Sequence, residues 1–245
     1  MTLSNESRDR VRHVFEPIVR AMGRAGLTPD ALTLIGFGIT VVGAVLVGMQ
    51  QWLLGGLVIF LGGVFDMFDG TLARATGRVS NLGAFMDSVF DRAGEVIVYF
   101  GMTVGSLTFW GQSETNFGLG AFLAPAAMGS AFMVSYVRAK AESLGFTTGT
   151  GMAAVGLMPR EVRLVILSLG LMLAGWSVRG NTSFPDVHFF DIGGFLLNLE
   201  AGHGYLALAL GIITIGSIIT TIQRILHVRS QARQQAACQS TENHT

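Results

Sequence analysis

Four aspartates, Asp66, Asp69, Asp87 and Asp91, lie at the ends of two strongly apolar segments. On helices, the first two would share one face (i, i+3), as would the last two (i, i+4), so a short turn could bring all four together. Clustered carboxylates in a place of low dielectric repel one another unless a cation neutralises them. Ligation by oxygen atoms alone suits Mg²⁺ or Mn²⁺, which commonly hold substrate phosphates together with carboxylates. The spacing therefore predicts a divalent-metal site rather than acids placed only for capping or solubility, because acids inside a membrane are costly.

Small residues and one cation accompany the acids. Gly70 and Gly83 remove side chains where a helix would otherwise crowd a ligand, and Ala73 is the next smallest residue. Arg74 places a positive charge beside the acids, which helps only when an anionic ligand arrives. These residue types fit a metal site that receives an anion.

The stretch from Asp66 to Asp91 resembles the signature of the CDP-alcohol phosphatidyltransferases, D-x2-D-G-x2-A-R-x8-G-x3-D-x3-D, and every fixed position is met. The resemblance implies a CDP-diacylglycerol donor and Mg²⁺ or Mn²⁺, as two ions. It also implies that Asp91 both ligates metal and acts as the general base. The implied metal ligands are Asp66, Asp69, Asp87 and Asp91. The implied CDP-binding residues are Asp66, Asp69, Gly70, Ala73, Arg74, Gly83 and Asp87.

The composition is that of a polytopic membrane protein. The chain has 245 residues, of which 50% are hydrophobic and only 13% charged, with 33 glycines of the kind that let membrane helices approach closely. The formal net charge is zero, so overall charge identifies no partner, and no nucleic-acid partner is predicted. The single cysteine, Cys238, excludes an internal disulfide.

We expect an all-α integral membrane protein with six transmembrane helices. The expected spans are residues 31–49, 52–76, 82–110, 119–142, 160–176 and 204–227. A cationic amphipathic helix over 5–25 is expected to lie in the cytoplasmic interface, and residues 178–203 are expected to contain an interfacial half-helix. This gives a juxtamembrane segment 1–27, a catalytic domain 28–229 and a polar, disordered tail 230–245.

The distribution of positive charge predicts the orientation. With six spans and the N-terminus inside, every Arg or Lys except Arg92 and Arg179 falls at or near the cytoplasmic side. The acidic cluster would then open to the cytoplasm, where a soluble substrate could reach it. Gly101 and Gly105 form a small-xxx-small pair that fits either helix packing or dimerisation, and the family resemblance favours a homodimer.

A second group of cations lies at the cytoplasmic ends of the later spans. Its members are Arg138, Lys140, Arg160, Arg163 and Arg224, and Lys140 is the only lysine in the chain. They fit either a binding site for a phosphate on the acceptor or ordinary positive-inside anchors. Together they predict a phosphorylated acceptor.

Residues 135–142, 160–163 and 223–224 narrow the resemblance. They are similar to segments of the prokaryotic phosphatidylinositol phosphate synthases, which join CDP-diacylglycerol to inositol 1-phosphate. The resemblance implies that Lys140, Arg160 and Arg224 bind the acceptor phosphate, with Arg138 and Arg163 as further candidates.

Two alternatives stay open. The first is a sister transferase that uses glycerol 3-phosphate, which also presents a phosphate to the cations. The second comes from another class, a divalent-cation transporter, since acids within a membrane also mark ion pathways. Binding sites of transporters typically lie near the membrane midplane on broken helices, often in proteins with internal repeats. Neither feature is visible in the sequence.

Overall fold

The computed structural model of the chain describes residues 22–24, 26–107, 117–118, 120–146, 155–180, 187–192, 195–199 and 203–242. The interfacial helix expected over residues 5–25 lies outside these ranges, apart from a helical turn at 22–24.

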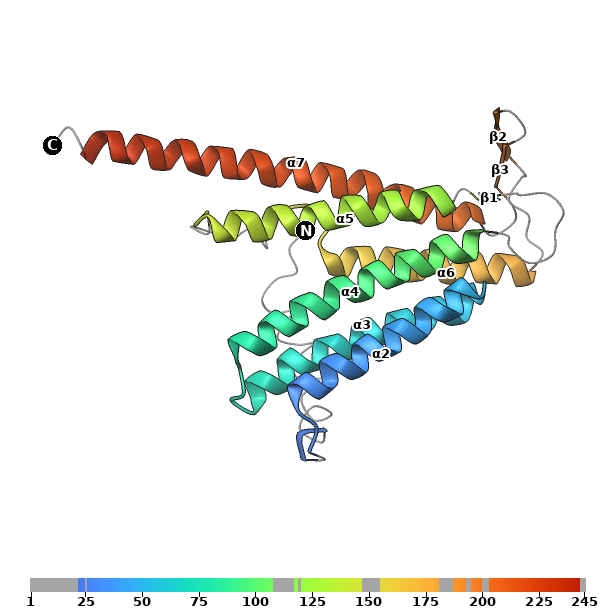
Figure 1. Cartoon of the computed structure of the whole chain (residues 1–245), viewed down its shortest axis with the longest axis horizontal. Coiled ribbons are helices and arrows are strands. Elements are labelled where there is room, and N and C mark those ends of the chain that lie inside the picture. Colours follow the sequence, from blue (N-terminus) through green and yellow to red (C-terminus); the bar gives the residue numbers. More distant parts are fainter. Residues whose placement is uncertain are drawn as a thin grey trace.

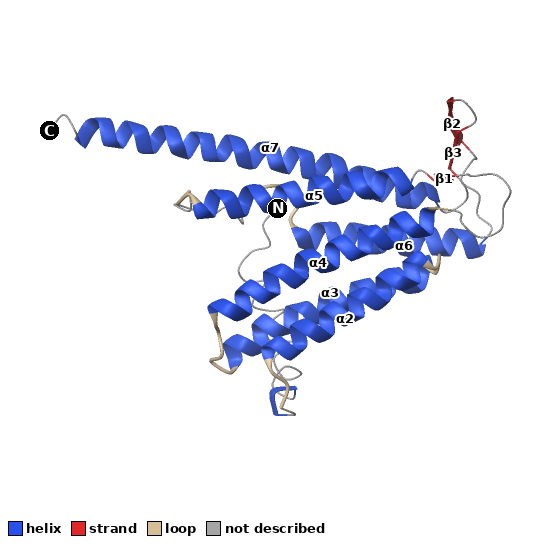
Figure 2. Ribbon diagram, in the orientation of Figure 1, coloured by secondary structure: helices blue, strands red, loops and turns tan. Residues whose placement is uncertain are grey.

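Six long helices dominate the described structure (Figures 1 and 2). They are α2 (Pro29–Gly48), α3 (Trp52–Ala75), α4 (Asn81–Ser106), α5 (Gly120–Ser143), α6 (Arg160–Gly180) and α7 (His203–Glu242). Three short strands form one small sheet in the order β1-β3-β2: β1 (Phe117–Gly118), β2 (Val187–Ile192) and β3 (Phe195–Leu199). The helical bundle is as predicted, whereas the sheet is not.

The starts of α2 and α4 follow from local capping. The Thr28 hydroxyl accepts a hydrogen bond from the Ala31 amide at 3.2 Å, and Pro29 occupies the first helical turn. The Ser80 hydroxyl accepts from the Gly83 amide at 2.9 Å and caps α4. Because only five residues, 76–80, separate α3 from α4, the end of α3 and the start of α4, which carry the aspartates, must lie close together.

Helix α3 lies between α2 and α6, and glycines on both of its faces allow this. A Cβ atom at Gly62 would lie 3.3 Å from the Thr40 amide nitrogen of α2, and one at Gly56 would lie 3.0 Å from the Ser168 carbonyl oxygen of α6. Helix α4 packs against α2 and α5, whereas α6 packs against α3 and α7. The arrangement leaves a space between α4 and α6 that side chains line.

The small residues of α4 serve packing within the chain. A Cβ atom at Gly101 would collide with the Ala44 carbonyl of α2, and one at Gly105 with the Val47 carbonyl. The pair therefore fits the helix-packing interpretation and is covered by α2, so it does not supply an exposed face for dimerisation.

Four of the described helices are long and apolar enough to cross a membrane: Pro29–Gly48, Trp52–Ala75, Gly120–Ser143 and the part Gly204–Ala236 of α7. Helices α4 and α6 are not among them by this measure. Both carry charged residues, Asp87, Asp91, Arg92 and Glu95 on α4 and Arg160, Glu161 and Arg163 on α6. The chain is a membrane-embedded protein, and both of these charged helices contribute residues to the site described below, together with α3.

The half-helix expected within residues 178–203 is wrong. Strands β2 and β3 pair antiparallel there, and β1 adds to β3 in parallel. The sequence contains the hairpin signal: two runs rich in Val, Phe, Ile and Leu are separated by Gly193-Gly194. In Figure 1 this sheet lies at the opposite end of the bundle from the α3–α4 connection.

The disordered tail expected from residue 230 is also wrong as far as Glu242. Helix α7 continues through it without a break and extends past the other helices (Figure 1). Residues 230–242 contain several Ala and Gln residues, one Arg and no Gly or Pro, so the segment has good helix propensity despite its polarity.

Candidate active site

Three of the four predicted aspartates form a group that could hold a metal ion. Asp66 and Asp69 project from α3 and Asp87 from α4, and each offers one carboxylate oxygen within 4.8 Å of the other two. Three hard oxygen ligands from two helices fit a divalent cation such as Mg²⁺ or Mn²⁺. The short α3–α4 connection and the i, i+3 spacing on α3 produce this arrangement.

Asp69 is the most deeply buried of the three and is held from two sides. One of its oxygen atoms, Oδ2, accepts a hydrogen bond from the Thr33 hydroxyl of α2 at 2.6 Å. The other accepts from the Gly70 amide. Both Asp69 and Thr33 are 6% exposed. These bonds fix the direction of the carboxylate before any ligand binds.

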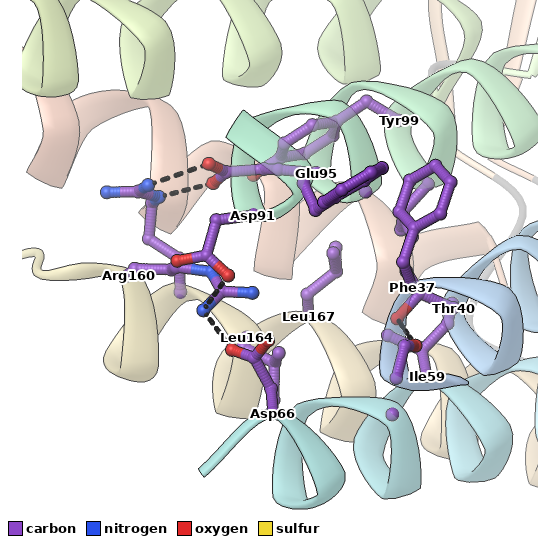
Figure 3. A pocket seen from close by; sticks show the side chains of 16 residues that line it. Phe37, Thr40, Ile59, Asp66, Asp91, Glu95, Tyr99, Arg160, Leu164 and Leu167 are labelled. Carbon is purple, nitrogen blue, oxygen red and sulfur yellow. Dashed lines mark hydrogen bonds and ion pairs between the residues drawn. The ribbon is translucent and has the colours of Figure 1, made fainter. Parts of the chain in front are cut away.

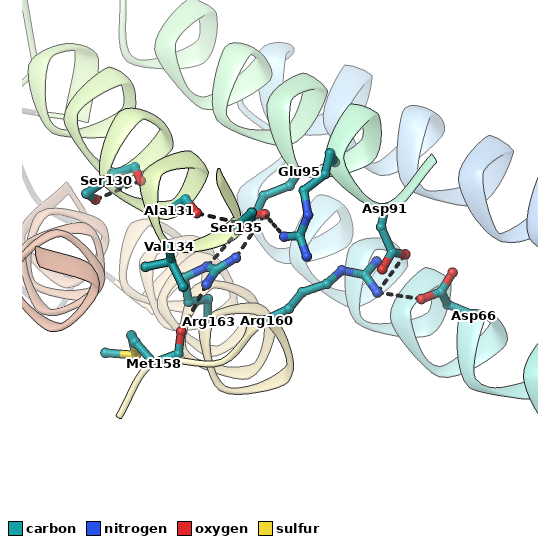
Figure 4. Close-up of polar contacts among 12 residues, drawn as sticks. Asp66, Asp91, Glu95, Ser130, Ala131, Val134, Ser135, Met158, Arg160 and Arg163 are labelled. Atoms are coloured by element: carbon teal, nitrogen blue, oxygen red, sulfur yellow. Dashed lines mark hydrogen bonds and ion pairs between the residues drawn. The ribbon is translucent and has the colours of Figure 1, made fainter. Parts of the chain in front are cut away.

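Asp91 lies one turn further along α4 than Asp87 and is linked to a cation from α6. The Nη1 atom of Arg160 lies 2.7 Å from Asp91 Oδ1 and 2.6 Å from Asp66 Oδ2 (Figure 4). One guanidinium nitrogen therefore bridges an acid of the metal group and the predicted base. This bridge brings a predicted acceptor-binding residue to the acidic cluster.

A pocket extends from these charged groups into the bundle between α2, α3, α4 and α6 (Figure 3). Its charged lining residues are Asp66, Asp91, Glu95, Arg160 and Arg163, and apolar residues such as Phe37 and Val98 line much of the remainder. Asp91 thus faces a cavity that is walled by helices. An acceptor hydroxyl bound there would be sheltered from bulk water.

The residues predicted to bind the nucleotide surround the α3–α4 connection. The Gly70 amide donates to Asp69, and the Gly83 amide donates to the Ser80 cap. Arg74 is exposed near the end of α3, and a Cβ atom at Gly70 would lie 3.5 Å from its Nη1 atom. Ala73, on the last turns of α3, is half-buried. These small residues leave room beside the acids for a bulky anionic ligand.

The other predicted acceptor cations differ in how far they are engaged. Arg224 is 4% exposed, and its Nε and Nη1 atoms donate to the carbonyls of Val155 and Val134 at 2.9 and 2.6 Å. Arg138 pairs with Glu142 at 2.8 Å on the surface of α5. Lys140 is exposed in the last turn of α5. Of the predicted group, Arg160 alone has a recorded contact with the aspartates in the described part of the chain.

Arg163 is committed to a partner that the sequence interpretation missed. Its Nε and Nη2 atoms donate to the two carboxylate oxygens of Glu95 on α4, at 2.8 and 3.0 Å. Its Nη1 atom donates to the Met158 carbonyl at 2.9 Å. Glu95 continues the series Asp87, Asp91 by another four residues, and this i, i+4 spacing is the signal that could have found it.

The geometry defines a class before it defines a substrate: a helical membrane enzyme with a divalent-metal site and an adjacent carboxylate. The family model for CDP-alcohol phosphatidyltransferases matches residues 26–213. The chain belongs to this family and is an enzyme of that class.

Within the family, the chain is similar to synthases of inositol phosphate lipids. The chain is 31% identical over 242 residues to the phosphatidylinositol phosphate synthase of Streptomyces avermitilis, which covers 98% of this chain and 88% of that protein. It is 36% identical over 160 residues to the archaetidylinositol phosphate synthase of Pyrococcus horikoshii, covering 65% of this chain and 77% of the relative.

Solved structures show the same fold. The phosphatidylinositol phosphate synthase of Mycobacterium tuberculosis with CDP-DAG bound superposes with a TM-score of 0.66 at 25% identity, covering 88% of this chain and 94% of that one. The same enzyme in complex with manganese and citrate gives a TM-score of 0.64 at 27% identity, covering 86% and 87%. A similar fold holding manganese agrees with a divalent-metal site at the aspartates of this chain.

Proposed function

We propose that this protein transfers the phosphatidyl group of CDP-diacylglycerol to inositol 1-phosphate and releases CMP. The observation that carries the proposal is the juxtaposition of a metal-capable aspartate group with Asp91 and Arg160, which line one pocket. The bacterial and archaeal relatives are named as synthases of phosphatidylinositol phosphate and archaetidylinositol phosphate, which differ in the lipid and share the inositol phosphate. This supports inositol phosphate as the acceptor.

Asp66, Asp69 and Asp87 would hold the metal, with Asp91 as a further ligand. Mg²⁺ or Mn²⁺ is expected, as two ions, because four carboxylates and one arginine leave a charge that a single divalent ion would not balance. When bound, the metal polarises the phosphoryl oxygens of the donor and neutralises the leaving phosphate. Gly70, Ala73, Arg74 and Gly83 line the space for the CDP group.

Asp91 acts as the general base. It accepts the proton of the acceptor hydroxyl while that oxygen forms a bond to the β-phosphorus of the donor. The bond between this phosphorus and the oxygen of CMP breaks, and CMP leaves with the electron pair. The place of Asp91 in a walled pocket, one turn beyond Asp87, supports this role over a purely metal-binding one.

Arg160, Lys140 and Arg224 bind the acceptor phosphate, and Arg138 remains a further candidate. Arg160 is the strongest of these, because its contact with Asp91 already places a cation within reach of the reacting hydroxyl. Arg224 donates to two backbone carbonyls through Nε and Nη1, so it would contribute through its positive charge and its Nη2 group, and by fixing α5 against residue 155.

We propose six membrane spans, because α4 and α6, with 26 and 21 residues, reach the roughly 20 residues needed to cross. The catalytic domain is residues 28–229. The active site faces the cytoplasm by the positive-inside rule, as does the N-terminus. The active assembly is a homodimer, whose interface lies outside the Gly101–Gly105 pair.

The test is CMP release by purified protein supplied with CDP-diacylglycerol and Mg²⁺. Inositol 1-phosphate, glycerol 3-phosphate and free inositol are compared as acceptors. Turnover with inositol 1-phosphate alone supports the proposal, whereas turnover with glycerol 3-phosphate alone reassigns the acceptor and keeps the chemistry. Cation flux into proteoliposomes without donor lipid, and no CMP release, would revive the transporter.

A further inference from the structure

We infer that Glu95 and Arg163 are positioning residues that set Arg160 against Asp66 and Asp91. Neither residue belongs to the aspartate signature, and Arg163 is removed by this inference from the candidates for direct phosphate binding. The inference rests on the proposed function only in taking Arg160 as the residue that meets the acceptor phosphate.

Two ion pairs join α4 to α6 as successive rungs (Figure 4). The outer rung is Asp91 with Arg160, at 2.7 Å, and the inner rung is Glu95 with Arg163. Asp91 and Glu95 are one turn apart on α4 (i, i+4), and Arg160 and Arg163 are one turn apart on α6 (i, i+3). The position of the inner rung therefore fixes where the outer rung can form.

The inner rung is built for rigidity. Arg163 is 2% exposed, and its planar fork binds both oxygens of Glu95 while its third nitrogen holds the Met158 carbonyl. Arg92 adds a second cation to Glu95 at 3.0 Å. Bidentate pairs of this kind restrict geometry as well as adding energy. Three of the five guanidinium N–H groups of Arg163 donate to protein oxygens, one from each nitrogen, so the orientation of its buried side chain is set by the protein.

The outer rung differs in the way a substrate site requires. Both arginines line the pocket, but Arg160 is 26% exposed against 2% for Arg163, and one Arg160 nitrogen makes both of its contacts with the acids. Other nitrogens of its guanidinium can therefore meet an incoming phosphate.

Close packing of α4 directly against α6 does not supply this alignment. Helix α6 packs on α3 and α7, and α4 packs on α2 and α5, so the pocket separates α4 from α6 near the site. Charged side chains bridge that space. Loosening the inner rung would let α6 shift relative to α4, and a misplacement of about 1 Å can cost on the order of 100-fold in rate.

The experiment compares Glu95→Gln and Arg163→Lys with the wild type. Both changes are close in shape but abolish the bidentate charged pair. We expect kcat/KM for inositol 1-phosphate to fall by about 10- to 100-fold, mainly through KM, with Mn²⁺ affinity within about threefold of wild type. Glu95→Asp, which keeps the charge, should recover part of the loss. The double variant Glu95→Gln/Arg163→Met removes both charges of the pair. It should therefore fold even if a single substitution, which leaves one buried charge unpaired, prevents folding. Its acceptor KM should rise as in the single variants.

Ile213→Ala is the control, because Ile213 is a fully buried residue of the hydrophobic core on α7 and is not among the residues that line the pocket. It should lower the melting temperature in detergent without a selective change in acceptor KM. An unchanged or lower KM in Glu95→Gln would mean that the freed Arg163 binds phosphate itself, and would overturn the inference. The inference would also be overturned if Glu95→Gln weakened metal, donor and acceptor binding equally and these losses followed the fall in melting temperature.

A distance measurement tests the inference without turnover. Spin labels on α4 and α6, at Phe100→Cys and Leu169→Cys in a Cys238→Ser background, replace exposed side chains. The interlabel distance should shift or broaden in Glu95→Gln and not in Ile213→Ala. An unchanged distribution in Glu95→Gln refutes the positioning role, whereas failure of the wild type to use any phosphorylated acceptor refutes the proposed function alone.

Discussion

Thr33→Val tests whether the support of Asp69 matters for metal binding. The change keeps the shape of the side chain and removes the hydroxyl that donates to Asp69 Oδ2 at 2.6 Å. The bond is buried, since both residues are 6% exposed, so water cannot replace it directly. Of the two hydrogen bonds to the Asp69 carboxylate in the described part of the chain, only the one from the Gly70 amide would then be left.

The size of the effect follows from the charge on the acceptor. A hydrogen bond to a charged group contributes about 1.5–3 kcal/mol, and each 1.4 kcal/mol is tenfold in affinity, which bounds the loss at about 10- to 150-fold. Rotation of the freed carboxylate toward the ion recovers part of this. Supporting residues around metal sites commonly contribute 10- to 100-fold, so we expect Mn²⁺ affinity to fall by about that factor.

The assay is titration of purified protein in detergent with Mn²⁺, following the signal of free Mn²⁺ by electron paramagnetic resonance. The Mg²⁺ concentration for half-maximal CMP release should rise in parallel. Thr214→Val is the matched control, because its hydroxyl donates to the Leu210 carbonyl of its own helix at 2.7 Å, far along the chain from the aspartates. Mn²⁺ affinity within twofold of wild type in Thr33→Val would show that Asp69 does not ligate the ion or does not need Thr33.

Three further predictions address the base, the acceptor and the packing. Asp91→Asn should abolish CMP release, by about 100-fold or more, while CDP-diacylglycerol binding is partly retained; a loss of donor binding equal to that of Asp66→Asn would refute the base. Lys140→Ala should raise KM for inositol 1-phosphate by about 10-fold and leave the KM of the donor unchanged, and equal effects on both would contradict its assignment. Gly56→Val should destabilise the protein by about 1–3 kcal/mol in thermal unfolding, because a side chain there meets the Ser168 carbonyl of α6; an unchanged melting temperature would show that α6 can yield.

Features that depend on spacing along one helix could be predicted from the sequence. The second span was expected over 52–76 and α3 runs from Trp52 to Ala75, because an apolar run and its flanking polar residues mark both ends. The grouping of Asp66, Asp69 and Asp87 likewise follows from helical periodicity and a short turn. Such features need no knowledge of how distant helices pack.

Contacts between distant segments could not be predicted in the same way. The Thr33–Asp69 bond joins residues 36 positions apart, and the Arg163–Glu95 pair joins residues 68 positions apart. Each depends on the rotation of two helices about their axes and on rotamers chosen by the surrounding packing. The sequence therefore indicated Arg163 as a free cation for a phosphate, whereas the fold gives it a carboxylate partner.

If α4 and α6 also cross the membrane, as we propose, the same contacts account for their absence from the four spans that composition marks. An unpaired charge within a membrane is costly, but charges that pair across a protein interior can be accommodated. Glu95 pairs with Arg163, and Asp91 with Arg160, so the charges of α4 largely offset those of α6 inside the bundle. A count based on each helix alone assigns the full cost to both. Charge complementarity between two helices that each fail a hydropathy criterion can therefore indicate that they face one another within a bundle.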